Sequence, residues 1–487
     1  MSNLSDRNHS FRRPRGGPTG SARASEPGVA VNLTTGELAQ AVGGRVLRRG
    51  PVVRGVSTDT RTLAAGEAFF ALLPREGEGA DGHTYVVEAA RRGAPAAVVC
   101  RAVPDVPEGL GLVEVDDPLL ALGRLAAQWR ARMPARIVTV TGSVGKTSTR
   151  AMLAAILSPL ARTLASERSF NNEIGVPLTL FRLDRSHEFC VLEFAMRGPG
   201  EIEYLTRIAR PEVAIVTNIG PSHIGRLGSL AAIASAKGEV LPLLPRTGAA
   251  ILNRDDPFYE QLRSRASCPV VSFGLHAEAA VRAEELEPDG LRGTAFTCCA
   301  GGARVRVRLA VPGAHFVANA LAAAAAARAL GVGLPDIAGG LSTYRGTEMR
   351  GLIVESPRGF TVLSDCYNAS PASVAAALQL LGAVEGRRVF VFGDMAELGD
   401  LGPEAHREAG ERAAEAGVQL MVTLGDLAKL AGQTAAQNGV VTQAVDSNEE
   451  AVEFLRGRLV PGDVVLVKGS RVMHLETVVE GLKADAR

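Results

Sequence analysis

The stretch Arg136-Ile-Val-Thr-Val-Thr-Gly-Ser-Val-Gly-Lys-Thr-Ser-Thr-Arg150 predicts a strand, a short loop and the start of a helix. Its first half is rich in β-branched residues, and Gly142 and Gly145 allow the tight turns of a loop. Lys146 and Thr147 open an apolar helical pattern, whose free N–H groups and dipole attract anions. In such a loop the lysine neutralises phosphate charge and the threonine hydroxyl can hold Mg²⁺. The stretch therefore predicts a nucleotide phosphate site made of Gly142, Ser143, Val144, Gly145, Lys146, Thr147 and Ser148.

This loop lacks one glycine of the usual phosphate-loop pattern. That pattern has four residues between its two glycines, whereas Val140 stands here at the place of the first glycine. An ordinary turn after a strand is the alternative interpretation. The strand, both glycines, Lys146-Thr147 and the helix nevertheless follow one another in the expected order, which favours the phosphate loop.

Length and composition limit the class of protein. The 487 residues predict about three domains, and 46% hydrophobic residues suffice for buried cores. Basic residues number 53 and acidic residues 52, so the net charge of +1 gives no reason to expect a nucleic acid or an anionic membrane as partner. The six cysteines form no CxxC pair, and no apolar segment reaches about 18 uninterrupted residues. We therefore expect a cytoplasmic protein with reduced thiols and no membrane insertion.

The beginning of the chain predicts a tail and a small α/β domain. Residues 1–30 are rich in Ser, Arg, Gly and Pro and lack the apolar core of a signal peptide, so we expect a disordered tail. In residues 31–116 short strands alternate with helical patterns, and polar side chains stand at strand ends, where open α/β sheets bind ligands. Turn-type hydrogen bonds explain these side chains equally well. The candidates are Ser57, Asp59, Arg61, Asp81 and His83.

Residues 117–346 contain the phosphate loop and are expected to form a central domain. The adjacent amides of Asn171 and Asn172 suit recognition of a polar substrate, and capping of a helix is the alternative. Gly175 and Pro177 follow closely and predict a stretch outside any regular helix.

Further polar candidates follow strands of the central domain. Glu193 ends an apolar strand, where a nucleotide-binding sheet places a second ligand of Mg²⁺, provided that the phosphate loop is real. His223 is a potential metal ligand, although a single histidine in a turn is more often a plain polar residue. Lys237 lies in a helical pattern, where a lysine is usually solvated. Asn253 belongs to another polar cluster at a strand end.

Residues 347–487 predict a third α/β domain. Gly346 and Gly351 around Arg350 mark its beginning, and four apolar strands separated by helical patterns indicate a mainly parallel sheet. Each strand ends in polar residues or glycine, and Asp365 follows the first strand. The predicted fold class is therefore α/β with three domains: a small N-terminal domain, a central phosphate-loop domain with a parallel sheet, and a C-terminal Rossmann-like domain.

The loop at residues 141–148 resembles the phosphate loop of the Mur ligases, ATP-dependent enzymes that extend the peptide stem of the peptidoglycan precursor. The resemblance covers nearly all of the chain after residue 30, and it accounts for the missing glycine. Further stretches are similar to the family member that acts last, and Gly-Asp-Met-Ala-Glu-Leu-Gly at residues 393–399 is the most discriminating. These stretches are residues 171–177, 218–223, 236–239, 365–371, 393–399 and 468–471.

The resemblance implies roles for the candidate residues. Lys146 would bind the ATP phosphates, Thr147 and Glu193 would hold Mg²⁺, and His223 would join a second Mg²⁺. Lys237 matches a lysine that the family carbamylates, which turns a cation into a carboxylate-like metal ligand. Lys146, His223 and Lys237 are thus the expected catalytic residues.

The remaining candidates would contact the nucleotide and the second substrate. The resemblance implies that Asn253 contacts adenine, Arg350 the phosphates, and Asp365 the ribose or the domain closure. The residues expected to contact the muramoyl substrate are Ser57, Asp59, Arg61, Asp81, His83, Asn171 and Asn172.

The implied activity is that of a monomeric amide ligase using ATP and Mg²⁺. It would join D-alanyl-D-alanine to UDP-N-acetylmuramoyl-tripeptide through an acyl phosphate, the last cytoplasmic step of UDP-muramoyl-pentapeptide synthesis. One alternative is a related ligase, either the enzyme that adds the third stem residue, whose DNPR signature is absent, or a folate polyglutamylating enzyme. A nucleotide-dependent switch would need an NKxD motif, which is absent. A non-catalytic scaffold would be expected to have lost Lys146, Glu193 or His223.

Overall fold

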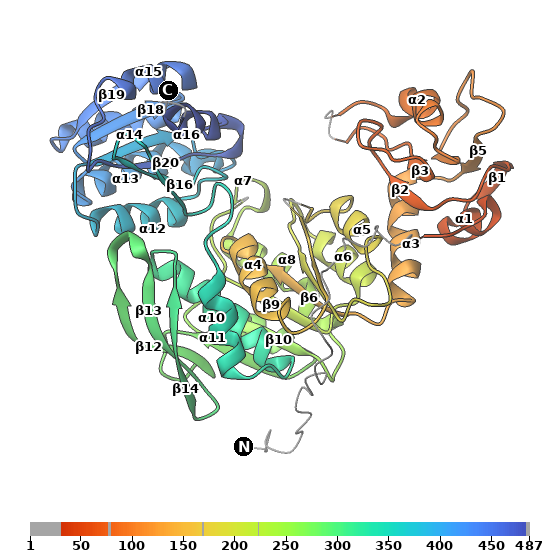
Figure 1. Ribbon diagram of the computed structural model, residues 1–487, viewed down its shortest axis with the longest axis horizontal. Helices are drawn as coiled ribbons and strands as arrows, with labels where there is room; N and C mark the ends of the chain where they lie inside the picture. Colours follow the sequence, from red (N-terminus) through yellow and green to blue (C-terminus); the bar gives the residue numbers. More distant parts are fainter. Residues whose placement is uncertain (1–30, 76–78, 168–169, 223, 484–487) are drawn as a thin grey trace. The chain divides into compact units, whose positions relative to one another are not determined.

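The computed structural model describes residues 31–75, 79–167, 170–222 and 224–483 (Figure 1). The predicted tail at residues 1–30 lies outside the described residues. The chain forms two compact units, the first made of Met1–Thr139, Leu160–Val213 and Leu243–Pro245, and the second of Val140–Pro159, Ala214–Pro242 and Arg246–Arg487. The boundaries of the three expected domains, 31–116, 117–346 and 347–487, stay a prediction.

The first unit contains a five-stranded sheet near the N-terminus. Strands β2 to β5 run parallel, and β1 closes one edge in the antiparallel direction. Helix α1 begins after Thr34, where Thr34 and Glu37 form a capping box that satisfies N–H groups of the first turn. In sheet order the strands are β1 (Arg45–Arg48), β5 (Gly111–Glu114), β4 (Ala96–Val99), β3 (Glu67–Phe70) and β2 (Gly55–Ser57), and the helices are α1 (Thr35–Val42), η1 (Gly82–Tyr85) and α2 (Val86–Arg91).

The rest of the first unit consists of three neighbouring strands and three helices. Asp117 caps α3 by accepting hydrogen bonds from the N–H groups of Leu119 and Leu120, and Pro118 fits the first helical position because it needs no donor there. The strands, in sheet order, are β6 (Arg136–Thr141), β8 (Phe189–Glu193) and β7 (Thr163–Ala165), and the helices are α3 (Pro118–Ala131), α5 (Gly175–Leu180) and α6 (Glu201–Ala209).

The prediction that residues 171–177 avoid a regular helix is wrong at their end. Helix α5 begins at Gly175 and includes Pro177 in its first turn. A proline is tolerated there because the first N–H groups of a helix have no partner within the helix. A glycine and a proline close together therefore marked the start of a helix and not a loop.

The second unit begins where β6 ends and the phosphate loop follows. The strands β10, β11 and β12 are parallel, and β12, β13 and β14 continue as antiparallel hairpins that the sequence pattern did not predict. Helix α10 packs on α4 and on the strands. In sheet order the strands are β9 (Val213–Val216), β10 (Ala249–Asn253), β11 (Val270–Gly274), β12 (Val281–Pro288), β13 (Thr294–Ala300) and β14 (Ala303–Leu309). The helices are α4 (Lys146–Leu157), α7 (Ile224–Leu227), α8 (Leu230–Lys237), η2 (Gly238–Leu243), α9 (Tyr259–Arg265), η3 (Gly290–Arg292), α10 (Ala314–Ala329) and α11 (Leu334–Thr343).

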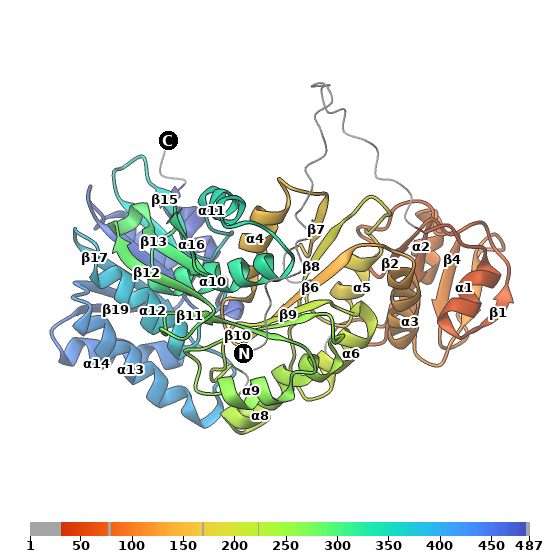
Figure 2. The ribbon, with the colours of Figure 1, turned by 90° about the horizontal axis from the view of Figure 1, so that it is seen from below.

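The second unit also contains a six-stranded sheet with helices on both faces (Figures 1 and 2). Alternate residues of β17 enter two cores: Phe390 and Phe392 pack with α12, α13 and α14, whereas Val389 and Val391 pack with α15 and α16. In sheet order the strands are β15 (Leu352–Glu355), β16 (Thr361–Ser364), β20 (Val464–Lys468), β17 (Arg388–Gly393), β18 (Leu420–Leu424) and β19 (Val441–Val445). The helices are α12 (Pro371–Gly382), η4 (Gly399–Leu401), α13 (Gly402–Glu415), α14 (Asp426–Gln437), α15 (Asn448–Arg456), η5 (Arg471–Met473) and α16 (Glu476–Lys483).

The predicted α/β class and the mainly parallel C-terminal sheet are confirmed. All strands of that sheet run parallel except β15, which pairs with β16 in the antiparallel direction. The edge strands β15 and β19 were not predicted. Among the described residues, none of the helices combines the length and the apolar character needed to cross a bilayer.

Candidate active site

The phosphate loop connects the end of β6 with the start of α4 and depends on two glycines. Gly142 and Gly145 have φ values of 141° and 82°, in the region that side chains other than glycine rarely adopt. A Cβ at Gly142 would overlap the Thr217 hydroxyl, and one at Gly145 would overlap the side-chain amide of Asn319. Both positions therefore require glycine for conformation and for space.

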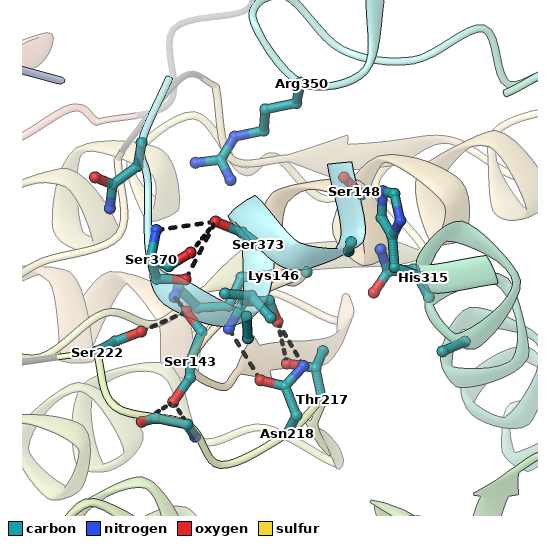
Figure 3. Close-up of a pocket in the computed structure, with 18 of the residues that line it drawn as sticks. Ser143, Lys146, Ser148, Thr217, Asn218, Ser222, His315, Arg350, Ser370 and Ser373 are labelled. Atoms are coloured by element: carbon teal, nitrogen blue, oxygen red, sulfur yellow. Dashed lines mark hydrogen bonds between the residues drawn. The ribbon is translucent and has the colours of Figure 1, made fainter. Parts of the chain in front are cut away.

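Residues after β9 fix the shape of this loop (Figure 3). Val144 N–H donates to Asn218 Oδ1 over 3.0 Å, and Asn218 Nδ2 donates back to the Val144 carbonyl over 3.1 Å. The Thr217 hydroxyl donates to the same carbonyl over 2.6 Å. Ser143 Oγ accepts from Gly220 N–H over 2.8 Å. The loop is thus pre-shaped by a segment about 75 residues further along the chain, which favours binding because little order has to be gained.

Lys146 lies at the start of α4 and points back over the loop. Its Nζ donates to the carbonyl of Gly142 over 2.7 Å and to that of Ser143 over 3.2 Å. These contacts keep the ammonium group beside the start of α4, where the helix dipole favours an anion.

A cavity of about 400 Å³ opens over the loop within the second unit (Figure 3). Its wall combines the phosphate loop, the ends of β9 and β10, the first turn of α10 and the segment between β16 and α12. The size and the polar groups fit a small-molecule ligand such as a nucleotide. The predicted site residues that line it are Ser143, Val144, Gly145, Lys146, Ser148, Asn253, Arg350 and Asp365.

Sequence reasoning assigned no role to several other residues of the cavity wall. Asn319 on α10 packs against Gly145, and Arg350 stacks on the ring of Tyr367 with its guanidinium carbon 4.0 Å from the ring centre. Lys468, at the end of β20, donates to Asp365 Oδ2 over 2.6 Å. Lys468 follows directly after an apolar strand, and Tyr367 lies in residues 365–371, one of the stretches similar to the family, whereas Asn319 gave no such signal.

Asn253 already uses its side chain within the protein. Its Nδ2 donates to the Thr217 carbonyl over 3.0 Å, and its Oδ1 accepts from Asp255 N–H over 3.0 Å. The side chain therefore ties the end of β10 to the end of β9, and its contact with adenine stays a prediction.

Lys237 is the last residue of α8 and is buried, with 1% of its surface exposed. Burial holds the pKa of its amine well below the usual value of 10.5, and the nearby charge of Lys146 lowers the pKa further. The alternative of a solvated lysine is thus excluded. Burial of this kind favours the neutral, nucleophilic form of the amine.

Asn171, Asn172 and Glu193 belong to the first unit. Glu193 is buried at the end of β8 and accepts a hydrogen bond from Asn171 Nδ2 over 2.9 Å. The Oδ1 atom of Asn172 accepts from the N–H groups of Ile174 and Gly175, at the start of α5. Capping, which was the alternative interpretation of the two amides, is therefore what Asn172 does in this structure.

The candidate residues of the small N-terminal sheet form two local clusters. Asp59 accepts hydrogen bonds from the Arg61 side chain, which lower the pKa of its carboxyl group, and Ser57 bonds to the backbone of Asp59. Arg61 is largely exposed, with 86% of its side-chain surface accessible. The hydrogen bonds run between neighbours in sequence, as turn chemistry requires.

The second cluster lies around Asp81 and His83. Asp81 Oδ1 accepts from His83 N–H over 2.9 Å, which lowers the pKa of the carboxyl group, and it lies 2.7 Å from His83 Nδ1. Arg101 forms an ion pair with the other carboxylate oxygen. His83 Nε2 accepts from Cys100 N–H over 3.0 Å, so the ring joins η1 to the end of β4.

The predicted Mg²⁺ ligands are divided among different parts of the chain. Thr147 and Lys237 belong to the second unit and Glu193 to the first, while His223 lies outside the described residues. Within the described part of the chain, no three side chains of His, Cys, Asp or Glu gather as a metal site.

The six cysteines are free thiols, as expected.

The sequence matches two family models. Residues 140–327 match the Mur ligase middle domain, and residues 349–471 match the Mur ligase, glutamate ligase domain. A curated relative, the UDP-N-acetylmuramoyl-tripeptide–D-alanyl-D-alanine ligase of Bacillus subtilis, is 35% identical over 435 residues, which cover 88% of this chain and 93% of the relative.

Two solved structures resemble this one over most of their length. MurF from Acinetobacter baumannii superimposes with a TM-score of 0.85 at 34% identity, covering 93% of this chain and 99% of that chain. The MurF ligase from Thermotoga maritima, solved in complex with ADP, has a TM-score of 0.78 at 26% identity, covering 89% and 98%.

Proposed function

This chain belongs to the Mur ligase family, and we propose that it is the ATP-dependent ligase that joins D-alanyl-D-alanine to UDP-N-acetylmuramoyl-tripeptide. The observation that carries the proposal is the cavity over the phosphate loop, because segments from across the second unit converge there around Lys146. The relative from Bacillus subtilis bears the name of this activity and aligns over nearly the whole chain. The proposed reaction is the last cytoplasmic step of UDP-muramoyl-pentapeptide synthesis, and we expect the chain to act as a monomer.

The reaction consists of two substitutions. An oxygen of the terminal tripeptide carboxylate attacks the γ-phosphorus of ATP, the bond from that phosphorus to the bridging oxygen breaks, and ADP leaves. The amine of D-alanyl-D-alanine then attacks the acyl carbon, the bond from this carbon to the phosphate oxygen breaks, and phosphate leaves as the amine gives up a proton. The main obstacle is repulsion between the carboxylate and the γ-phosphate, both of them negative.

The charge of Lys146 counters this repulsion. The ammonium group is held beside the loop by the carbonyls of Gly142 and Ser143, so a phosphate bound there meets a positive charge that is already in place. Preorganised charge of this kind lowers the barrier without a further cost of rearrangement. Arg350 lines the same cavity and would add a second positive charge towards the phosphates.

The residues proposed to hold Mg²⁺ are Thr147, Glu193, His223 and carbamylated Lys237. Bound Mg²⁺ would supply positive charge between the reacting carboxylate and the phosphate. The lowered pKa of the buried Lys237 amine fits this role, because it favours the neutral form, and only a neutral amine adds to CO₂, forming a carbamate and releasing a proton. A carbamate would also replace the charge repulsion between Lys237 and Lys146 by attraction.

The other predicted contacts complete the proposal. Asn253 would contact adenine, and Asp365 would accept a hydrogen bond from the ribose. In the first unit, the clusters at Ser57, Asp59 and Arg61 and at Asp81 and His83 would face the UDP end of the muramoyl substrate. Asn171 and Asn172 would contact the same substrate.

ADP release with different acceptors tests the proposal. The chain is supplied with ATP, Mg²⁺ and UDP-muramoyl-tripeptides that carry meso-diaminopimelate or lysine as the third residue. We expect ADP release with at least one of them to require D-alanyl-D-alanine, and the product to gain the mass of the dipeptide. Release that responds to glutamate with a folate acceptor, or to diaminopimelate with a muramoyl-dipeptide, and not to D-alanyl-D-alanine would overturn it.

A further inference from the structure

Lys468 is a buried cation at the edge of the proposed nucleotide cavity. It is the last residue of β20, which lies between β16 and β17 in the six-stranded sheet, and 1% of its surface is exposed. Its Nζ donates to Asp365 Oδ2 over 2.6 Å, to the Asn368 carbonyl over 3.2 Å and to the Asp365 carbonyl over 3.4 Å. An ammonium group has three protons, so these acceptors leave none for a ligand.

All three acceptors belong to the loop of residues 365–368, which follows β16. Asp365, Tyr367 and Asn368 of this loop line the cavity. The loop also carries the contact that places Arg350, since the guanidinium group stacks on Tyr367 and Tyr367 N–H donates to the Met349 carbonyl over 3.1 Å. The position of this loop therefore decides where a carboxylate and a guanidinium group meet the ligand.

Because Lys468 is buried, its position and the position of the loop of residues 365–368 depend strongly on each other. A loop that moved away would leave a buried ammonium group without acceptors, which costs far more than losing an exposed ion pair. Replacing the lysine would in turn leave the Asp365 carboxylate and two carbonyls without their common donor. The lysine and the loop are thus stable in one arrangement only.

We propose that Lys468 is a positioning residue, which holds the loop of residues 365–368 so that Asp365 and the Tyr367–Arg350 pair are placed for the nucleotide. It acts through Asp365 and not by touching the ligand. This inference rests on the proposed function insofar as the ligand of the cavity is an adenine nucleotide.

Calorimetric binding of ADP to the full chain tests the proposal. The variants are Lys468→Met, which keeps the length of the side chain, Lys468→Arg, Asp365→Asn and the double variant Lys468→Met/Asp365→Asn. The control is Lys429→Met, because Lys429 is a partly exposed lysine whose ion pairs with Asp426 and Asp446 lie away from the cavity.

We expect Lys468→Met to weaken ADP binding about 10- to 100-fold and to raise KM for ATP more than it lowers kcat. Lys468→Arg should recover part of the affinity. The double variant should bind ADP within about threefold of Asp365→Asn alone, because two residues that act through one contact are not additive. Lys429→Met should bind as the unchanged chain does.

Two outcomes would overturn the proposal. One is additive losses in the double variant; the other is unchanged ADP affinity in Lys468→Met at a temperature where it is fully folded. Should Lys468→Met fail to fold, Asp365→Asn decides alone, since unchanged ADP affinity in that variant contradicts the proposal. Because the deciding measurement is ADP binding and not turnover, it stands apart from the proposed ligase activity: a chain that binds ADP but ignores D-alanyl-D-alanine would overturn only the latter.

Discussion

The predicted sites in the two units are built in different ways. In the second unit, the phosphate loop is held by residues 217–220 and shares a cavity with Asn253, Arg350 and Asp365, so distant segments converge on one space. In the first unit, the candidate cluster of Ser57, Asp59 and Arg61 bonds within itself, between neighbours in sequence.

Local hydrogen bonds and the convergence of distant segments differ as evidence for a binding site. A turn satisfies its own side chains, so local hydrogen bonds say nothing about a ligand. Convergence of distant segments on a cavity is not required by any local structure, and it therefore supports a binding site more strongly.

Lys146→Ala should reduce kcat for D-alanyl-D-alanine-dependent ADP release at least about 1,000-fold. The physical reason is the loss of the positive charge that the loop holds where the ATP phosphates are proposed to bind. Steady-state kinetics measure the effect, with Lys429→Ala as the control for removing a lysine elsewhere in the unit. Turnover close to that of the unchanged chain would show that the loop is an ordinary turn.

Gly145→Ala should weaken ADP binding about 100-fold, because φ is 82° and the new Cβ would overlap the Asn319 amide. Gly339→Ala in α11 is the matched control. Nothing lies within 4 Å of its added Cβ, so alanine should raise the stability by up to about 1 kcal/mol and leave ADP binding unchanged. Calorimetry and thermal unfolding measure the two effects. Equal ADP affinity in both variants would contradict the account of the loop.

Asp81→Asn should lower the melting temperature by about 2–4 °C at pH 7. The hydrogen bond from His83 N–H lowers the pKa of Asp81, so its carboxylate stabilises the fold above the usual pKa of 3.8. This stabilisation is lost as the pH falls through the lowered pKa of the folded state. The difference between variant and unchanged chain should therefore shrink below pH 3.8. A difference that grows towards low pH would be the opposite of what we predict.

Arg61→Ala should leave the melting temperature unchanged, because an exposed ion pair contributes little. We expect KM for the UDP-muramoyl substrate to rise about 3- to 10-fold, with kcat nearly constant, as for a residue that binds the ground state and the transition state equally. Kinetics at varied UDP-muramoyl-tripeptide concentration decide the question. An unchanged KM would mean that the Ser57–Arg61 cluster is a turn and nothing more.

Sequence patterns were sufficient to predict features that depend on a few neighbouring residues. The phosphate loop, the capped helix at Thr34 and the four strands of the C-terminal sheet follow from periodicity, turn residues and capping groups over a few positions. Strand ends also indicated the candidates Asn253 and Asp365, since parallel strands end at one edge of a sheet.

Features that depend on residues far apart in the sequence could not be predicted from local sequence patterns. Lys237 looked like a solvated helical residue, and only the packing around α8 shows it to be buried. Asn319 sits in an alanine-rich helix, where nothing in the local pattern reveals that it faces Gly145. The role of Lys468 depends on strand order, because β20 lies beside β16, about 100 residues earlier in the chain.

Transfer of oxygen-18 from substrate to phosphate tests whether the reaction passes through an acyl phosphate. The chain would receive ATP, D-alanyl-D-alanine and UDP-muramoyl-tripeptide labelled with oxygen-18 in its terminal carboxylate. Because a carboxylate oxygen attacks the γ-phosphorus and later leaves with it, we predict one labelled oxygen in the inorganic phosphate for each amide bond formed. Label found in AMP, or phosphate without label while the amide forms, would contradict an acyl phosphate intermediate.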